Sequence, residues 1–144
     1  MTTARALALA MLLAPTLSAG AGGASAGRTA PLCFQADVNG TAHVVVLHIL
    51  GGPTPSFDLL AAYLADGATF PAWGSARLRE DGRLDFGIAT GGHVTPERRL
   101  LVGRLDPATG TGAGHLVLDN TIIPGSIPAT FSPAPCPAAF ADAP

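Results

Sequence analysis

The sequence predicts an all-β fold, an eight-stranded antiparallel up-and-down barrel that is closed or nearly closed. Three observations lead to this prediction. Short apolar runs are separated by glycine- and proline-rich turns roughly every 10–15 residues, a spacing typical of β-sandwiches and barrels. Two hairpins can be given a register that places apolar side chains on one face. The only two cysteines, Cys33 and Cys136, lie at opposite ends of the predicted strands.

The first residues are typical of a secretory signal peptide, which we expect to span residues 1–26. A basic residue precedes an apolar run from Ala6 to Leu17, and small residues follow up to Ala26. The run is too short to remain as a membrane-spanning helix. We therefore expect an exported protein, periplasmic or extracellular, with no transmembrane segment.

Residues 27–136 are predicted to form a single β-rich domain, and residues 137–144 a frayed C-terminal tail. Charged residues make up 12% of the chain, the net charge is −2, and every basic residue is arginine. This alanine- and glycine-rich composition is typical of a GC-rich bacterial genome. It offers no basic patch for nucleic acid, since the doublet Arg98-Arg99 is interpreted as a solvated strand end.

Eight segments have the apolar content and the flanking turn signals of strands. They are residues 32–38, 42–50, 57–65, 72–79, 83–90, 98–105, 114–119 and 128–134. The run between Ala108 and Gly114 is rich in glycine and is interpreted as a flexible hairpin.

The first hairpin turns at Asn39-Gly40, the preferred pair for a two-residue type I′ loop. This loop pairs Val38 with Thr41, Ala36 with His43 and Phe34 with Val45. The apolar residues of both strands then share one face. The other face is not cleanly polar, because it carries Val44 and Val46 beside polar residues.

The second hairpin is predicted to close through a three-residue loop, residues 80–82, with Gly82 in the left-handed conformation. This register pairs Leu78 with Leu84 and Ala76 with Phe86 on one face. It sets Arg77 opposite Asp85 on the other face, where unlike charges attract across the strands. A two-residue loop would instead pair apolar with charged residues.

Residues 56–66 are ambiguous between strand and helix. Ser56 is a suitable N-cap, Gly67 suits the position after a helix, and three apolar residues would share a helical face. The meander, in contrast, needs a strand here, and tertiary context can override local propensity. We predict a strand at 57–65, with seven strands plus a short helix as the alternative.

The two cysteines support the even strand count. In an up-and-down meander, the first strand starts and the last strand ends at the same end of the sheet only if the number of strands is even. A disulfide needs Cα atoms within about 7 Å. Two cysteines in an exported chain predict a disulfide, so Cys33 and Cys136 favour eight strands over seven.

The predicted barrel resembles lipocalins and avidin-like barrels in architecture only. The Gly-x-Trp signature of lipocalins is absent, because Trp73-Gly74 has the reverse order and lies mid-chain. A β-sandwich is the alternative fold.

No catalytic constellation is visible in the sequence, and we predict no enzyme activity, no cofactor and no metal site. The histidines are not spaced as zinc ligands, and the acidic residues mostly occupy turns. Candidate ligand-binding residues are therefore those of the barrel interior and its rim: Phe34, His43, Trp73 and Phe86.

Two interpretations of function remain. The barrel could bind a small apolar ligand, because eight strands enclose room for side chains or for one small ligand. Alternatively, a filled barrel could be a structural or protein-interaction module of the cell envelope, with its apolar outer face covered by another protein. The oligomeric state is left open.

Overall fold

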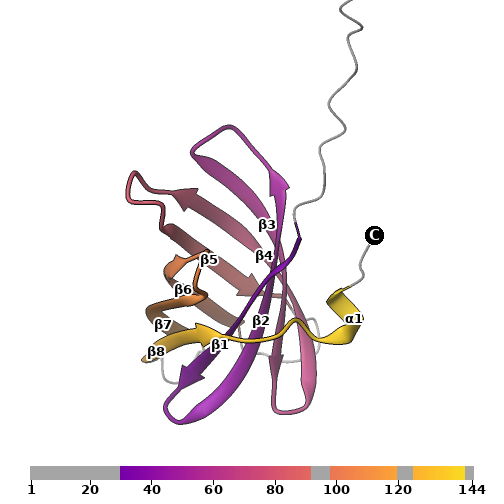
Figure 1. The fold of residues 1–144 in the computed structure, drawn as a ribbon. Coiled ribbons are helices and arrows are strands. Elements are labelled where there is room, and N and C mark those ends of the chain that lie inside the picture. Colours follow the sequence, from indigo (N-terminus) through magenta and orange to yellow (C-terminus); the bar gives the residue numbers. More distant parts are fainter. Residues whose placement is uncertain (1–29, 92–97, 120–124, 142–144) are drawn as a thin grey trace, which may run out of the picture.

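The protein is a closed eight-stranded antiparallel barrel, as predicted (Figure 1). The computed structural model describes residues 30–91, 98–119 and 125–141. Its elements are β1 (Leu32–Val38), β2 (Thr41–Gly51), β3 (Ser56–Ala65), β4 (Ala68–Leu78), β5 (Leu84–Thr90), β6 (Arg98–Asp106), β7 (Thr111–Asp119), β8 (Gly125–Pro133) and α1 (Ala138–Ala141). Each strand pairs with its neighbour in sequence, and β8 pairs with β1 to close the barrel.

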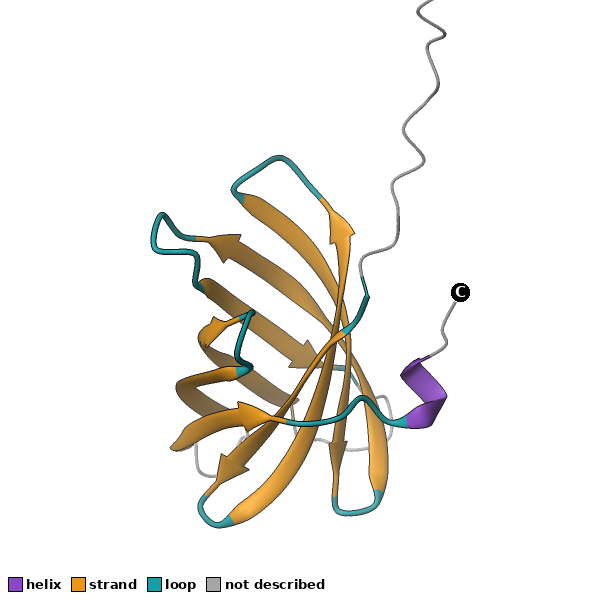
Figure 2. Cartoon of the chain, viewed as in Figure 1, coloured by secondary structure: helices purple, strands orange, loops and turns teal. Residues whose placement is uncertain are grey.

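The barrel has two distinct ends. We call the end where β1 begins and β8 finishes the disulfide end, because Cys33 and Cys136 are bonded there. The other end, where β1 and β3 finish at the turns Asn39-Gly40 and Asp66-Gly67, is called the mouth end. Nearly all of the described chain is strand, and the single helical turn lies outside the barrel wall (Figure 2).

Both predicted hairpin registers are confirmed. Phe34 pairs with Val45, and the turn residues Asn39 and Gly40 have φ angles of 53° and 79°. In the second hairpin Arg77 pairs with Asp85, and Gly82 has a φ of 79°. The sequence could predict both registers because each turn type fixes which residues face one another.

The segment from Ser56 to Ala65 is a strand, so the alternative of a helix is wrong. Its inward side chains alternate with outward ones, as the buried residues Leu59, Ala61 and Tyr63 show. The segment pairs along its whole length with β4, and from Asp58 to Leu64 with β2. Backbone pairing on both sides outweighs a weak local preference for helix.

Three strands begin earlier than predicted, because strand pairing continues through residues that resemble turns in the sequence. β4 begins at Ala68, β7 at Thr111 and β8 at Gly125. Of the glycines that suggested a flexible hairpin, Gly112 and Gly114 lie inside β7, whereas Gly110 is in the turn before it with a φ of 70°. Gly114 faces Gly103 of β6, and the ring of Phe131 lies on both residues.

The interior of the disulfide half is filled by aromatic and aliphatic side chains. Phe34, Phe86 and Phe131, which we call the aromatic core, have ring centroids 5.1–5.6 Å apart. Leu84 and Leu105 are buried in the same cluster. Small residues in this half accommodate the rings: a Cβ on Gly103 would lie 2.5 Å from Phe131.

The C-terminal segment is fastened to the outside of the barrel. The Cα atoms of Cys33 and Cys136 are 5.2 Å apart, and the disulfide joins residues separated by 103 positions. Beyond it, Phe140 of α1 packs with Val46 and Ala62 on the outer face of β2 and β3. Val46 of the outer apolar face is therefore covered by a residue of the C-terminal segment.

Candidate functional site

The four candidate ligand residues do not form one site. Phe34 and Phe86 belong to the aromatic core of the disulfide half. His43 also points inward, but it lies at the mouth end, where β2 begins. Trp73 lies on the outer surface with 58% of its side chain exposed, and its indole covers Gly91.

Polar side chains gather inside the barrel at the mouth end. Strand alternation turns one side chain inward from each of five consecutive strands, four of them polar and one the aromatic ring of Phe70. We call this group the mouth cluster: His43 of β2, Tyr63 of β3, Phe70 of β4, Thr90 of β5 and Arg99 of β6. Among the described residues, the other buried interior side chains are apolar.

His43 and Tyr63 form a buried hydrogen-bonded pair. The side chains are 6% and 1% exposed, and Nδ1 of His43 shares a hydrogen bond with the Tyr63 hydroxyl. The two residues come from adjacent strands, and their rings are perpendicular at 83°. Burial of a polar group costs free energy unless the group is hydrogen-bonded. The hydrogen bond between His43 and Tyr63 offsets part of this cost.

Arg99 brings a permanent positive charge into the mouth cluster. Its guanidinium carbon lies 5.2 Å from the centroid of the Phe70 ring, an arrangement for cation–π attraction. The hydroxyl of Thr90 accepts a hydrogen bond from the Arg99 backbone N–H at 3.2 Å and donates one to its carbonyl at 3.4 Å. The arginine is thus positioned through its backbone and its side chain.

The environment keeps both His43 and Tyr63 neutral. Burial is the main reason that the pKa of His43 is lowered; Asp66 and Asp37 oppose the shift and Arg99 adds to it. Burial also raises the pKa of Tyr63 to about 12, with Arg99 opposing. Both groups therefore act as neutral hydrogen-bonding groups near pH 7.

The imidazole of His43 has one nitrogen without a hydrogen-bond partner among the described residues. Nδ1 is bonded to Tyr63, and Nε2 has no such partner. Every deeply buried side-chain nitrogen or oxygen of the described residues is hydrogen-bonded, so Nε2 is not fully enclosed by their atoms. Nε2 is therefore the polar atom of the pair that can bind a further group.

The sequence analysis named His43 but not Tyr63, Thr90 or Arg99 as candidate site residues. The alternation of inward and outward side chains along a strand could have identified Arg99. Arg99 is two residues before Leu101, which is buried inside, so the alternation of β6 already places Arg99 on the inner face. The two arginines of the doublet therefore differ. Arg98 is exposed, as we predicted for both residues, whereas Arg99 is only partly exposed.

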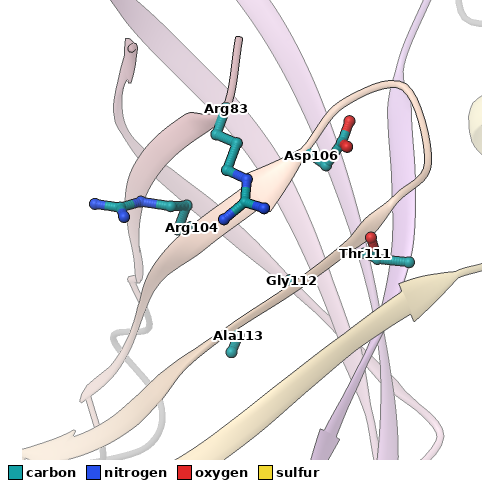
Figure 3. Close-up of a pocket in the computed structure, with 6 residues that line it drawn as sticks. All are labelled: Arg83, Arg104, Asp106, Thr111, Gly112 and Ala113. Carbon is teal, nitrogen blue, oxygen red and sulfur yellow. The ribbon is translucent and has the colours of Figure 1, made fainter. Parts of the chain in front are cut away.

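Described residues also line two hollows on the outer surface. One, of about 290 Å³, is lined by Arg83, Arg104, Asp106, Thr111, Gly112 and Ala113 (Figure 3). Arg83 extends over it, but Arg104 points away, because its Nε donates to Asp85 at 2.7 Å. The two guanidinium groups therefore do not converge on one anion. The other, about 350 Å³, lies across β4, β5 and β6 on the same exposed side.

Asp85 lies at the centre of an exposed ion-pair network. It accepts hydrogen bonds from Arg104 and from Arg79 at 2.9 Å, which hold its pKa below its usual value. Its cross-strand neighbour Arg77 forms no ion pair with it among the described contacts. Exposed pairs of this kind contribute little to stability, and the network needs no ligand to explain it.

An apolar row crosses the outer face of the barrel. We call it the outer apolar row, and it follows the strand register from β3 to β7 through Leu60, Trp73, Ala89, Leu100 and Val117. Leu60 is 49% and Leu100 is 38% exposed. Contiguous exposed apolar surface is a feature of interaction sites.

The described residues contain no group of three or more His, Cys, Asp or Glu side chains that could hold a metal ion. Within the same part of the chain, no helix has the length and apolar character needed to cross a membrane. A comparison with protein-family models, with curated proteins and with solved structures found no match to this chain. The site must therefore be interpreted from its own chemistry.

Proposed function

We propose that the protein is an exported binding protein whose barrel takes a small, largely apolar ligand through the mouth end. The observation that carries this proposal is the mouth cluster. Among the described residues, the barrel interior is otherwise apolar, yet four polar side chains lie together at this end and Nε2 of His43 has no hydrogen-bond partner among them. Convergent polar groups at an apolar barrel mouth are the usual features of a ligand site.

The distribution of large and small side chains supports a site in the mouth half. The aromatic core occupies the disulfide half, so a ligand cannot extend through the whole barrel. Beside the mouth cluster, the inner wall of β3 and β4 is formed by small residues, among them Ala61, Ala65 and Ala72. Aliphatic Leu118 and Ile127 complete the opposite wall.

We assign the mouth cluster to binding and not to a reaction. A tyrosine whose pKa is about 12 stays protonated at pH 7 and is a poor general base. His43 shares its Nδ1 with that tyrosine, and no carboxylate orients it among the described hydrogen bonds. The cluster is well suited to hydrogen-bond a polar group of a ligand.

The test uses naphthalene-2-carboxamide, a small neutral apolar probe, and two matched variants on β4. Ala72→Leu adds bulk beside Thr90, its neighbour in the strand pairing, whereas Ala76→Leu adds the same bulk beside Phe86. We expect the wild-type protein and Ala76→Leu to bind the probe, and Ala72→Leu to lose binding. Circular dichroism checks that both variants fold. Binding that survives Ala72→Leu, or no binding to the wild-type protein, contradicts the proposal.

A second candidate function is a protein-interaction module, and the outer apolar row is the observation that favours it. Leu60, Trp73 and Leu100 would then contact another protein or a second copy of the chain. Sedimentation of the mature protein, alone and with Leu60→Gln plus Trp73→Gln, provides the test. A monomer without co-purifying partners in both cases contradicts this function.

A further inference from the structure

We infer that the ligand of the mouth is an organic monoanion, most simply a carboxylate on an apolar body, whose anionic group binds between Arg99 and the His43–Tyr63 pair. This inference rests on the proposed function, which supplies the site, and adds the chemical class of the ligand. It combines the position of Arg99, the donors of the buried pair and the apolar surroundings.

The guanidinium of Arg99 is placed to meet an anion that enters the barrel. Its guanidinium carbon lies over the Phe70 ring, 5.2 Å from the ring centroid, which holds the charged group at the mouth end of the barrel. A guanidinium has five N–H donors, so it can keep a protein partner and still bind a carboxylate. Contact with the aromatic ring also restricts the side chain, which reduces the entropy that binding costs.

The His43–Tyr63 pair supplies a further donor whichever way its proton lies. If the Tyr63 hydroxyl donates to Nδ1, the neutral imidazole carries its proton on Nε2, the nitrogen that has no partner among the described residues. If Nδ1 donates instead, the Tyr63 hydroxyl keeps its own proton to donate. Either arrangement leaves one donor for an anionic oxygen.

The surrounding charges favour a single negative charge on the ligand. Arg99 acts on the titration of both His43 and Tyr63, so these three groups interact electrostatically across the mouth. Asp66 acts on the same two groups, and Asp37 acts on His43, with the opposite sign. The two carboxylates offset the charge of Arg99, so a monoanion meets less repulsion at this site than a dianion does.

The apolar neighbours define the rest of the ligand. Phe70, Leu118 and Ile127 are partly buried against the interior and line the opening beside the polar groups. A carboxylate is the anion that a guanidinium edge binds in a planar, two-point manner. An apolar body attached to it would contact these side chains, and the burial of that body adds affinity in proportion to its area.

The test compares naphthalene-2-carboxylate with naphthalene-2-carboxamide, which have the same shape and differ in charge. We expect the wild-type protein to bind the carboxylate about tenfold or more tightly than the carboxamide, measured by isothermal titration calorimetry. Arg99→Gln should remove this preference by weakening only carboxylate binding. Arg99→Lys should keep part of it, because the charge remains while the planar group is lost.

The matched control is Arg98→Gln, which removes the same charge from the adjacent, exposed position of β6. This variant should keep the full preference, and its thermal unfolding should match that of Arg99→Gln closely enough to show that both fold. Equal affinities in the wild-type protein, or a preference that survives Arg99→Gln, overturn the inference while the proposed function stands. Failure of both probes to bind the wild-type protein overturns the proposed function itself.

Discussion

At the scale of single residues, neighbouring positions in the sequence have opposite roles because a strand alternates its side chains. Arg98 and Arg99 are identical and adjacent, yet the first faces solvent and the second faces the barrel interior. Trp73 and Tyr63 are each the only residue of their kind in the chain, and they lie on opposite sides of the barrel wall. The spectroscopic signals of Tyr63 and Trp73 can therefore report separately on the interior and on the outer surface of the barrel.

The ionisation of Tyr63 is the first prediction. Ultraviolet absorbance of the folded protein should show the single tyrosine ionising near pH 12, against 10.0 for an unperturbed group, because burial disfavours the anion. The neutral form is favoured by folding, so this contribution to stability is complete below pH 10 and is lost as pH rises towards 12. Denatured protein provides the reference. Ionisation near pH 10 in protein that remains folded contradicts the described burial.

At the scale of elements, turn chemistry and alternation predicted most of the fold. Asn39-Gly40 and Gly82 determine two registers through their backbone conformations, so those hairpins could be derived from the sequence. The early starts of β4, β7 and β8 could not be derived from the sequence. Pro71, Gly112 and similar residues are read as turn residues as long as their cross-strand partners are unknown. The mouth cluster was missed for the same reason: closure of the barrel brings its strands together.

Gly103 of β6 is a position where packing between strands leaves no room for a larger residue. A Cβ at this position would lie 2.5 Å from the Phe131 ring and 2.8 Å from the Ala113 carbonyl oxygen. We predict that Gly103→Ala lowers the free energy of unfolding by about 1–3 kcal/mol through overpacking. The matched control is Gly87→Ala on β5, where the nearest atom would be at an ordinary 3.5 Å. Equal denaturation midpoints for the two variants would show that Phe131 packs as well against alanine as against glycine at position 103.

At the scale of the whole molecule, closure accounts for the position of the cysteines. The eighth strand returns the chain to the end where the first strand began, and the disulfide joins the two segments beside the β1–β8 pairing. The parity of the strand count could be derived from sequence because it depends only on topology. The packing of Phe140 over Val46 could not, since nothing local indicates that the tail returns to this face.

We predict that removing the disulfide with Cys33→Ala plus Cys136→Ala costs about 4–5 kcal/mol, the chain-entropy value for a closed loop of this length. The bond restricts the unfolded chain, so the loss should appear in guanidinium unfolding of protein that still has barrel-like circular dichroism. Phe140→Ala, which keeps the bond and removes the covering side chain, should cost less. An unchanged midpoint for the cysteine variant would show that the closed barrel does not depend on the bond.

We propose that the ligand binds inside the mouth end and not on the outer face. The most direct measurement is a nuclear magnetic resonance titration of the mature protein with naphthalene-2-carboxylate, observing a labelled tyrosine ring and the tryptophan indole. Each signal comes from a single residue. We predict that the Tyr63 resonances shift with saturation while the Trp73 indole does not. A shift of Trp73 with Tyr63 unchanged would place the ligand on the outer apolar row and contradict the account.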